Sequence, residues 1–371
     1  GQFEAMVDEA MQGPWTEKEL PHVYAWMQAN ATVIDQIFKA LERPHYFAPL
    51  VRTADDESLS AILLPQLGFL RETSRLIAAR GLHAFANGDP EKTLADAIRL
   101  QKFGKLVSQE PTLIGVLVGI SIQNMQRELI ETLVEAGELS QQDALLYLDS
   151  YKQVGAVDAI DRAINETERS MTLDTIQRAW AGSRTDLNLF IGQGGEDARR
   201  AAKRMDAVVR SRFFDINHSL RSVNNRYDEL LSISVIEDID QRKKSYEAFN
   251  EVAAVPDGGK RIAKLIGISA TGTLPEGWTA ERYTDEVTAV YTLLLMADAE
   301  SAGRTQRRTQ TRQLVQATAI ALLGYRDKHG ELPESLDALV PTYFDAVPID
   351  FATDKPLVYR VKDDGSALVY S

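Results

Sequence analysis

The sequence predicts a mainly α fold of stacked antiparallel helix pairs, with one small β hairpin that makes only the C-terminus α+β. Three observations support this prediction. Apolar residues recur at helical spacing over most of the chain up to about residue 330. Capping residues, glycines and prolines divide that part into segments of helix length. Alternating apolar residues around a turn signal occur only near the end of the chain.

The first helices are separated by prolines. Thr16 and Glu19 have the spacing of a capping box, so we expect a helix from Thr16 to Leu41. Two prolines interrupt the segment from Arg43 to Pro49, because proline lacks an N–H donor and forces extended neighbours. A long helix from Ser58 to Asn87 follows, and we expect it to be kinked or divided near Pro65.

Residues 87–90 contain a signal that ends one helix and a signal that begins the next. Gly88 is suited to end one helix, and Asp89 followed by proline is suited to begin the next, from Lys92 to Ser108. The following helix opens at Glu110-Pro-Thr and ends at Gly137, and Ser140 caps another to Val154. We expect Gly115 and Gly119 to let a neighbouring helix approach closely in the core.

The second half of the helical region has longer segments. We expect helices over 156–180, 196–234, 237–255 and 260–268, with the strongest break at Pro256-Asp-Gly-Gly259. A helix beginning at Trp278 is expected to run to Lys328. This organisation predicts a helical domain over residues 1–272, followed at 273–371 by a long helix and a C-terminal module.

The C-terminal module should contain the only clear sheet. Its strands are expected at 357–361 and 367–370, on either side of the turn Asp363-Asp-Gly365. A hairpin of this size is not stable alone. The module is therefore expected to form a small core against the helix that carries Ile320 and Tyr325, using Leu336, Leu339, Tyr343, Val358 and Tyr359.

Composition excludes several classes of function. The chain of 371 residues has a formal net charge of −13 and a pI of about 5.0. This charge disfavours binding to nucleic acid or to an anionic membrane, because both need a positive surface. The absence of cysteine from the sequence excludes disulfides, thiolate metal sites and a cysteine nucleophile.

The sequence contains no assembled catalytic motif. The five histidines have no metal-binding spacing, and neither a phosphate-binding glycine loop nor a Gly-x-Ser-x-Gly motif occurs. Paired carboxylates such as Glu166 and Glu168 are expected on solvated helix faces. Asp215 and His218 are expected to form a local hydrogen bond. We therefore expect no catalytic residue, no metal and no cofactor.

Two runs of arginine and lysine are candidates for contact with a charged partner. The first spans 199–212 and is interleaved with acidic residues, which favours i,i+4 pairing on a solvated helix. The second comprises Arg304, Arg307, Arg308 and Arg312. Fewer acidic residues follow it, so internal pairing is less strongly favoured there.

The segment from Arg43 to Pro49 supplies the candidate ligand-binding residues, which are Arg43, His45, Tyr46 and Phe47. Loops held by a rigid scaffold often carry function. Aromatic residues between prolines also commonly plug a helix junction, and this structural interpretation is favoured. In either case we expect the loop to pack against the apolar helix that begins near Pro111.

The chain from Arg304 to Ser371 resembles the C-terminal region of type II secretion pseudopilins. The matching residues are Tyr325, Gly330, Pro333, Leu336, Leu339, Pro341, Tyr343, Pro348, Asp350, Pro356 and Tyr359. Pseudopilins begin with a hydrophobic helix that this sequence does not contain. Many of them bind calcium near the C-terminus, but the turn at Asp363 to Gly365 does not match that loop.

The rest of the chain is similar to a family of exported bacterial proteins without an assigned activity. The similarity rests on Pro14-Trp-Thr-Glu-Lys-Glu-Leu-Pro21, Arg43-Pro-His-Tyr46 and the apolar segment from Glu110 to Ile120. It implies an exported protein, either periplasmic or anchored in a membrane and facing outside the cytoplasm. The chain opens on Gly1-Gln2, so we expect any signal or anchor to lie before Gly1.

These observations favour a non-enzymatic, extracytoplasmic scaffold or binding protein. Its expected partner is a protein or another envelope component rather than nucleic acid, with membrane contact only through a segment before Gly1. The alternative is a carboxylate-dependent hydrolase acting on an exported or cell-envelope substrate. A deep cleft with two facing acids and strongly shifted pKa values would favour that alternative.

Overall fold

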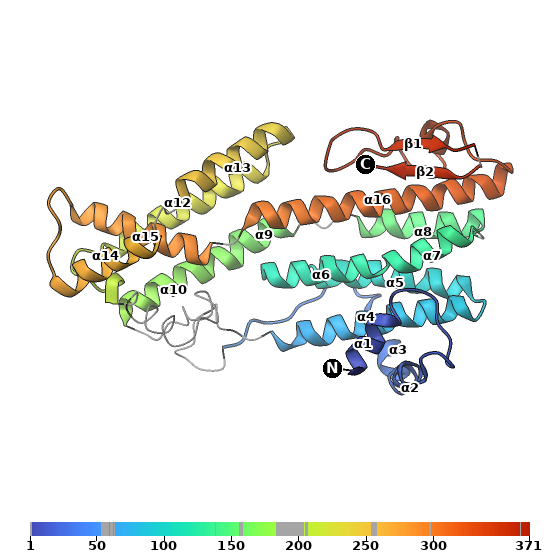
Figure 1. The fold of residues 1–371 in the computed structure, drawn as a ribbon, viewed down its shortest axis with the longest axis horizontal. Coiled ribbons are helices and arrows are strands. Elements are labelled where there is room, and N and C mark those ends of the chain that lie inside the picture. The colour runs from blue at the N-terminus through green and yellow to red at the C-terminus, as the bar shows by residue number, and fades with distance from the viewer. Residues whose placement is uncertain are drawn as a thin grey trace.

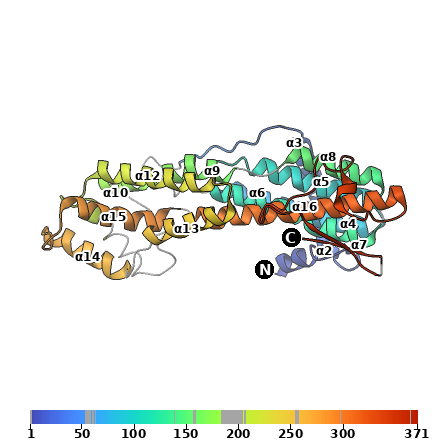
Figure 2. The ribbon, with the colours of Figure 1, turned by 90° about the horizontal axis from the view of Figure 1, so that it is seen from above.

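The protein is an elongated stack of helices with a small hairpin module beside one end of its longest helix (Figure 1, Figure 2). The computed structural model describes residues 2–52, 59, 62, 64–137, 139–155, 159–182, 204, 207–253, 258–296, 298–363 and 365–371. The mainly α prediction with a C-terminal hairpin is confirmed.

The N-terminal helices are shorter than their sequence pattern predicts. They are α1 (Gln2–Glu9), α2 (Pro21–Ala29), α3 (Ala31–Ala40) and α4 (Pro65–Ala86). The helix predicted from Thr16 is wrong at its start, because the Thr16 N–H and hydroxyl both donate to Glu19 and close a turn before Pro21. Asn30 then divides the segment, and Pro65 begins α4.

The next helices follow their capping signals closely. They are α5 (Pro90–Val107), α6 (Leu113–Met125), α7 (Arg127–Ala136) and α8 (Gln141–Val154). Asp89 accepts a hydrogen bond from the Lys92 N–H, and Ser140 forms a reciprocal capping box, as predicted. The helix predicted from Glu110 to Ala136 is instead two helices joined at Gln126.

Glycines bring α5 and α6 into close contact. A Cβ on Gly119 would lie 2.5 Å from the Ser108 nitrogen and 2.7 Å from the Gly104 oxygen. A Cβ on Gly115 would lie 2.3 Å from the Glu110 Cβ. No side chain fits at these positions. The predicted close approach of a neighbouring helix is confirmed for Gly119, whereas Gly115 packs against Glu110 and Thr112, which directly precede α6 in the chain.

The second half contains a π-helical turn among its α-helices. Its elements are α9 (Ile160–Ala163), the π-helix η2 (Ile164–Glu168), α10 (Arg169–Ala181), α12 (Ile216–Ser234), α13 (Ile239–Ala253), α14 (Gly258–Thr271) and α15 (Ala280–Leu295). Residues 211–215 are not helical, so an unbroken helix over 196–234 is wrong. Asp215 is the N-cap of α12, where its side chain accepts hydrogen bonds from the backbone N–H groups of Asn217 and His218.

Helix α16 (Ala299–His329) is the longest element and extends along both halves of the molecule (Figure 1). The prediction of one helix from Trp278 to Lys328 is wrong. Met296 has an extended backbone, and Asp298 caps a new helix by accepting from the Ser301 N–H.

Buried side chains form two hydrophobic clusters. The first joins α1–α8 to the C-terminal part of α16 and to the module, and the second joins one face of α6 and α9–α15 to the start of α16. Ala302 belongs to the second cluster and Leu314 to the first, so α16 contributes to both. The domain boundary between residues 272 and 273 stays a prediction.

The C-terminal module begins with a 3₁₀ helix, η4 (Leu336–Leu339), and ends with β1 (Val358–Val361) paired antiparallel to β2 (Ala367–Tyr370). Leu336, Leu339 and Tyr343 are buried with Ile320, as predicted. Val358 is exposed, however, and Leu357 is buried in its place. Adjacent strand residues point to opposite faces, so the prediction was wrong for Val358, whereas Tyr359 and Tyr325 pack against this core as predicted.

Candidate functional site

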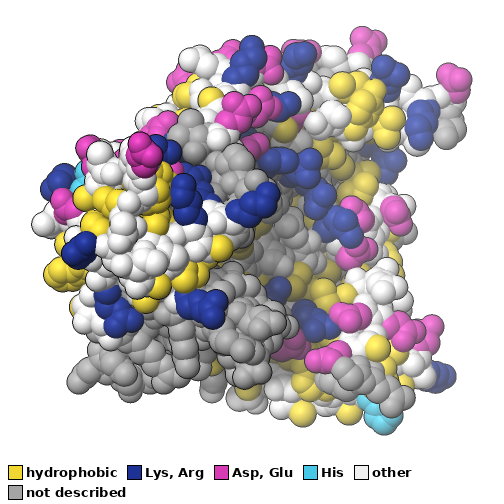
Figure 3. Space-filling model, turned by 60° about the vertical axis from the view of Figure 1, so that its left-hand side comes forward, with side chains coloured by type: hydrophobic (Ala, Val, Ile, Leu, Met, Phe, Trp, Pro, Cys, Tyr) yellow, Lys and Arg dark blue, Asp and Glu magenta, His cyan; other side chains and the backbone are white. Residues whose placement is uncertain are grey.

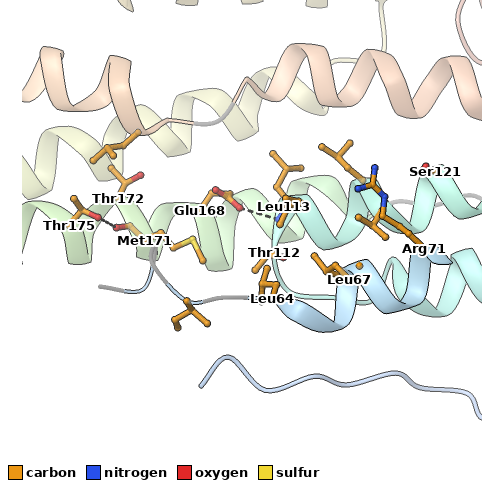
Figure 4. Close-up of a pocket in the computed structure, with 16 residues that line it drawn as sticks. Leu64, Leu67, Arg71, Thr112, Leu113, Ser121, Glu168, Met171, Thr172 and Thr175 are labelled. Carbon is orange, nitrogen blue, oxygen red and sulfur yellow. Dashed lines mark hydrogen bonds between the residues drawn. The ribbon is translucent and has the colours of Figure 1, made fainter. Parts of the chain in front are cut away.

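A cavity of about 790 Å³ lies where the two hydrophobic clusters meet. Helices α4 and α6 form one side, and η2 with α10 forms the other, as Figure 4 shows. Leu295 at the end of α15 also contributes. The described lining residues are Ile62, Leu64, Leu67, Gly68, Arg71, Thr112, Leu113, Ile114, Leu117, Val118, Ser121, Glu168, Met171, Thr172, Thr175 and Leu295.

The walls of the cavity are mainly aliphatic. Helix α6 provides Leu113, Ile114, Leu117 and Val118, which recur at helical spacing. Met171 faces them from α10. Ile114 is 57% exposed, so apolar surface continues from the cavity to solvent. Apolar walls with a few placed polar groups are the usual lining of a small-molecule site.

Glu168 is the only carboxylate among the described lining residues. Its Oε1 accepts a hydrogen bond of 3.0 Å from the Leu113 N–H at the start of α6. Burial raises the pKa of Glu168, and the hydrogen bond from Leu113 opposes this change. A raised pKa means that the protonated carboxyl, which can donate a hydrogen bond, persists to a higher pH than it does in an exposed glutamate.

The position of Glu168 depends on the π-helical turn. Glu168 is the last residue of η2, and π-helical turns are often found at functional sites. The carbonyl of Glu168 accepts from the hydroxyl of Tyr227, which also bonds Thr172 at 2.8 Å. Tyr227 is fully buried in the second cluster. Tyr227 of α12 therefore holds the π-helical turn, and with it the Glu168 side chain, in position.

A cationic side chain lies at another part of the lining. Arg71 comes from α4 and is exposed, and it forms no ion pair among the described residues. Ser121 lies near it, whereas Glu168 lies farther along the cavity (Figure 4). The cavity therefore offers an apolar body, a hydrogen-bonding carboxyl and a separate positive charge.

Asp174 on α10 anchors the chain that precedes α4. Its carboxylate accepts from the Leu59 N–H at 2.9 Å and from Arg52 at 3.1 Å. Arg178 on the same helix also donates to Asp174, at 3.0 Å. These contacts hold Arg52 and Leu59 against α10, beside one wall of the cavity.

The predicted ligand-binding residues lie outside the described cavity lining. Tyr46 is partly buried, and its N–H donates to Gln109 at 2.8 Å. Arg43 and His45 are exposed, and Phe47 is 82% exposed. The loop does contact the segment just before α6, but Phe47 does not plug a helix junction. A role for these four residues in ligand binding stays a prediction.

Tyr46 contacts a second buried carboxylate. Its hydroxyl donates to Glu110 Oε1 at 3.2 Å, and Gln66 donates to the same atom at 3.3 Å. Glu110 is 0% exposed, and its Oε2 has no hydrogen-bond partner among the described residues. Burial raises the pKa of Glu110, although the bonds from Gln66 and Tyr46 oppose it. Glu110 is absent from the described cavity lining.

Other predicted motifs have structural roles. Asp215 caps α12 and forms the predicted local hydrogen bond with His218 through the His218 N–H, at 3.1 Å, while the His218 ring bonds Asp285 at 2.7 Å. No group of metal-binding side chains occurs within the described ranges. In the basic run over 199–212, Arg204, Arg210 and Arg212 are described and exposed, while Arg199, Arg200 and Lys203 lie outside the described residues.

Sequence reasoning missed Glu168 and Arg71 as candidate site residues. Glu168 was expected on a solvated face with Glu166, and only Glu166 is exposed. The π-helical turn inserts a residue in the helical repeat, and this changes the face on which Glu168 lies. Neither residue belongs to a motif, so only the arrangement of α4, α6, η2 and α10 around the cavity identifies them.

Comparisons of the chain with protein-family models, curated proteins and solved structures gave no match. The expected resemblance to pseudopilins and to exported bacterial proteins therefore stays a prediction.

Among the helices of the described chain, none combines the length and the apolar character needed to cross a membrane.

Proposed function

We propose that the protein is a non-enzymatic binding protein whose cavity takes a small molecule with an apolar body and one polar end. The observation that carries this proposal is the cavity of about 790 Å³, which falls in the range of ligand sites. Its walls are aliphatic, so burying an apolar ligand would release ordered water and supply most of the binding free energy.

The polar groups would set the orientation of the ligand. Glu168, when protonated, can donate to a carbonyl or hydroxyl oxygen of the ligand while its Oε1 accepts from Leu113. Arg71 can hold a more polar or anionic end near solvent. Such a ligand would lie along the cavity between α6 and α10.

Binding is favoured over carboxylate-dependent hydrolysis. Hydrolysis by paired carboxylates requires two acids on either side of the reacting bond. Glu168 stands alone in the described lining, and Glu110 bonds Tyr46 and Gln66 outside it. An exported location and a protein or envelope partner are part of the same proposal, and cell fractionation of the native host tests them.

A change that fills the cavity tests the binding function directly. Gly68 lies in α4 on the cavity wall, and a Cβ there would meet nothing within 4 Å. Gly68→Leu should occupy cavity volume without a clash. The affinity for the neutral fluorescent probe N-phenyl-1-naphthylamine, followed by its emission, should fall about tenfold or more.

Gly267→Leu is the matched control. Gly267 is also helical, and a Cβ there would likewise meet nothing within 4 Å, but this residue does not line the cavity. The control should bind the probe like the original protein. Equal affinity in all three proteins, or no probe binding at all, would contradict the proposed function.

A further inference from the structure

A second cleft, lined by cationic side chains, lies between α13 and α16. It has a volume of about 300 Å³ and is formed by α13, the first turns of α16 and the loop that carries Ala352. Its described lining residues are Ile239, Arg242, Lys243, Tyr246, Glu300, Arg304, Arg307, Arg308 and Ala352. Lys and Arg side chains also gather in the hollow of the face shown in Figure 3.

The cleft concentrates positive charge in an acidic protein. Its lining has five cations and one acid, whereas the whole chain has a net charge of −13. Glu300 is already paired with Arg304 at 2.9 Å. Arg242, Arg307 and Arg308 form no ion pair in the described part of the chain. The usual explanation for a basic run, pairing with acids on the same helix, therefore applies to Arg304 and not to Arg307 or Arg308.

The fold brings the cations together and holds two of them in place. Arg242 comes from α13 and donates to the Ile236 carbonyl at 2.7 Å, which fixes its guanidinium. Arg307 is partly buried on α16. Burial lowers the pKa of Arg307, and the charges of Arg242 and Arg304 lower it further. A bound anion would offset this mutual repulsion.

Apolar side chains complete the cleft. Tyr246 is only 5% exposed, and Ile239 lies beside it on α13. The cleft thus combines several guanidinium groups with an apolar wall. Guanidinium groups bind phosphate oxygens through paired N–H donors, and the wall suits the organic part of an ester.

We propose that the cleft between α13 and α16 binds a phosphoryl-bearing anion through Arg242, Arg307 and Arg308. The ligand class is a phosphate ester or diphosphate, present either as a free molecule or as a lipid headgroup. This site is separate from the apolar cavity and does not depend on its function.

Calorimetric titration with inorganic pyrophosphate tests the free form of the ligand, at constant ionic strength. The double variant Arg307→Gln and Arg308→Gln should lower the affinity about tenfold or more, because two charge-assisted contacts are lost. Pelleting with phosphatidylglycerol vesicles, compared with phosphatidylcholine vesicles, tests the headgroup form with the same variant.

Arg360→Gln with Lys362→Gln is the matched control, because it removes two positive charges from exposed positions on the hairpin module. It should bind like the original protein. If the double variant does not fold, Arg308→Glu replaces it, because this variant changes only one exposed side chain. It should likewise weaken the binding of pyrophosphate or of the anionic vesicles.

Binding in either form supports the proposal if the cleft variants weaken it and the control does not. Pyrophosphate binding identifies a free ligand, and binding to the anionic vesicles alone identifies a headgroup. If neither probe binds, or if the cleft variants and the control weaken binding equally, the proposal is overturned.

Discussion

Two buried carboxylates, Glu110 and Asp350, differ in the number of hydrogen bonds that they accept from their neighbours. Glu110 and Asp350 are both almost inaccessible to solvent. Glu110 receives two long hydrogen bonds on one oxygen, while Asp350 accepts from several hydroxyls and one backbone N–H. Burial raises a carboxyl pKa, and hydrogen bonds to the charged form lower it. These two residues therefore have opposite pH dependences.

Glu110→Gln should stabilise the protein above the pKa of this carboxyl. The raised pKa means that folding opposes ionisation, so the penalty is absent at low pH and grows as pH rises above the ordinary value of 4.5. The free energy of unfolding, measured with urea at pH 8, should increase by about 1 kcal/mol. The difference should disappear near pH 4, and a destabilised variant at pH 8 would contradict this account.

Asp350→Asn should destabilise the C-terminal module. Burial alone would raise the pKa of Asp350, but hydrogen bonds from Ser371, Thr311 and Thr353 lower it to about 2. The lowered pKa contributes stability that is present above the ordinary value of 3.8 and is lost as pH falls towards 2. The variant should lose about 2 kcal/mol at pH 7.

Thermal and urea unfolding between pH 2 and pH 7 measure the effect of Asp350→Asn. Asp354→Asn removes a charge from an exposed neighbour and serves as the control. The stability difference between Asp350→Asn and the original protein should shrink as the pH approaches 2. A constant difference across this range would show that ionisation of Asp350 is not the cause.

At the scale of elements, α5 and α6 make the closest helix contact found at any described glycine. Gly104 and Gly119 face each other, and backbone atoms occupy the space that a side chain would need. The contact also places the start of α6, and with it Leu113 and Ile114, on the cavity wall. The geometry of the candidate site thus depends on two residues that do not line it.

Gly119→Ala should cost about 3 kcal/mol or more, because its Cβ would overlap the Ser108 and Gly104 backbones and the helices would have to separate. Urea unfolding measures this loss. Gly267→Ala, at a helical position with open space, should instead be neutral or stabilising by up to about 1 kcal/mol. Equal stability of the two variants would disprove the close packing of α5 and α6.

At the scale of the whole molecule, α6 and α16 connect the two hydrophobic clusters. Val116 on α6 belongs to the second cluster and Val118 to the first. Helix α16 changes from one cluster to the other between Ala302 and Leu314 without a break. Because both helices are shared, unfolding one cluster should remove support from the other.

Leu230→Ala should therefore weaken both clusters together. Leu230 is buried in the second cluster, and its truncation should cost about 2–5 kcal/mol. Trp15 reports on the first cluster and Trp278 on the second, in variants that retain only one tryptophan. Both fluorescence transitions in urea should move to the same lower midpoint. Separate transitions, with only that of Trp278 shifted, would show that the clusters unfold independently.

The sequence by itself determined the features that depend on neighbouring residues. The caps at Asp89 and Ser140, the helix end at Gly137 and the hairpin turn near Gly365 all follow from local hydrogen bonds or from backbone conformations that favour glycine. The close helix contact at Gly119 of α6 was also identified correctly. Local chemistry was sufficient because each feature is satisfied within a few residues.

The tertiary structure alone decided which polar residues meet. Glu168 reaches the cavity because a π-helical turn changes its face, and the cationic cleft forms because Arg242 on α13 meets Arg307 on α16. The burial of Leu357 instead of Val358 likewise depends on packing between distant segments. Sequence periodicity describes one element at a time, whereas a site is made by contacts between elements whose relative placement no local pattern specifies.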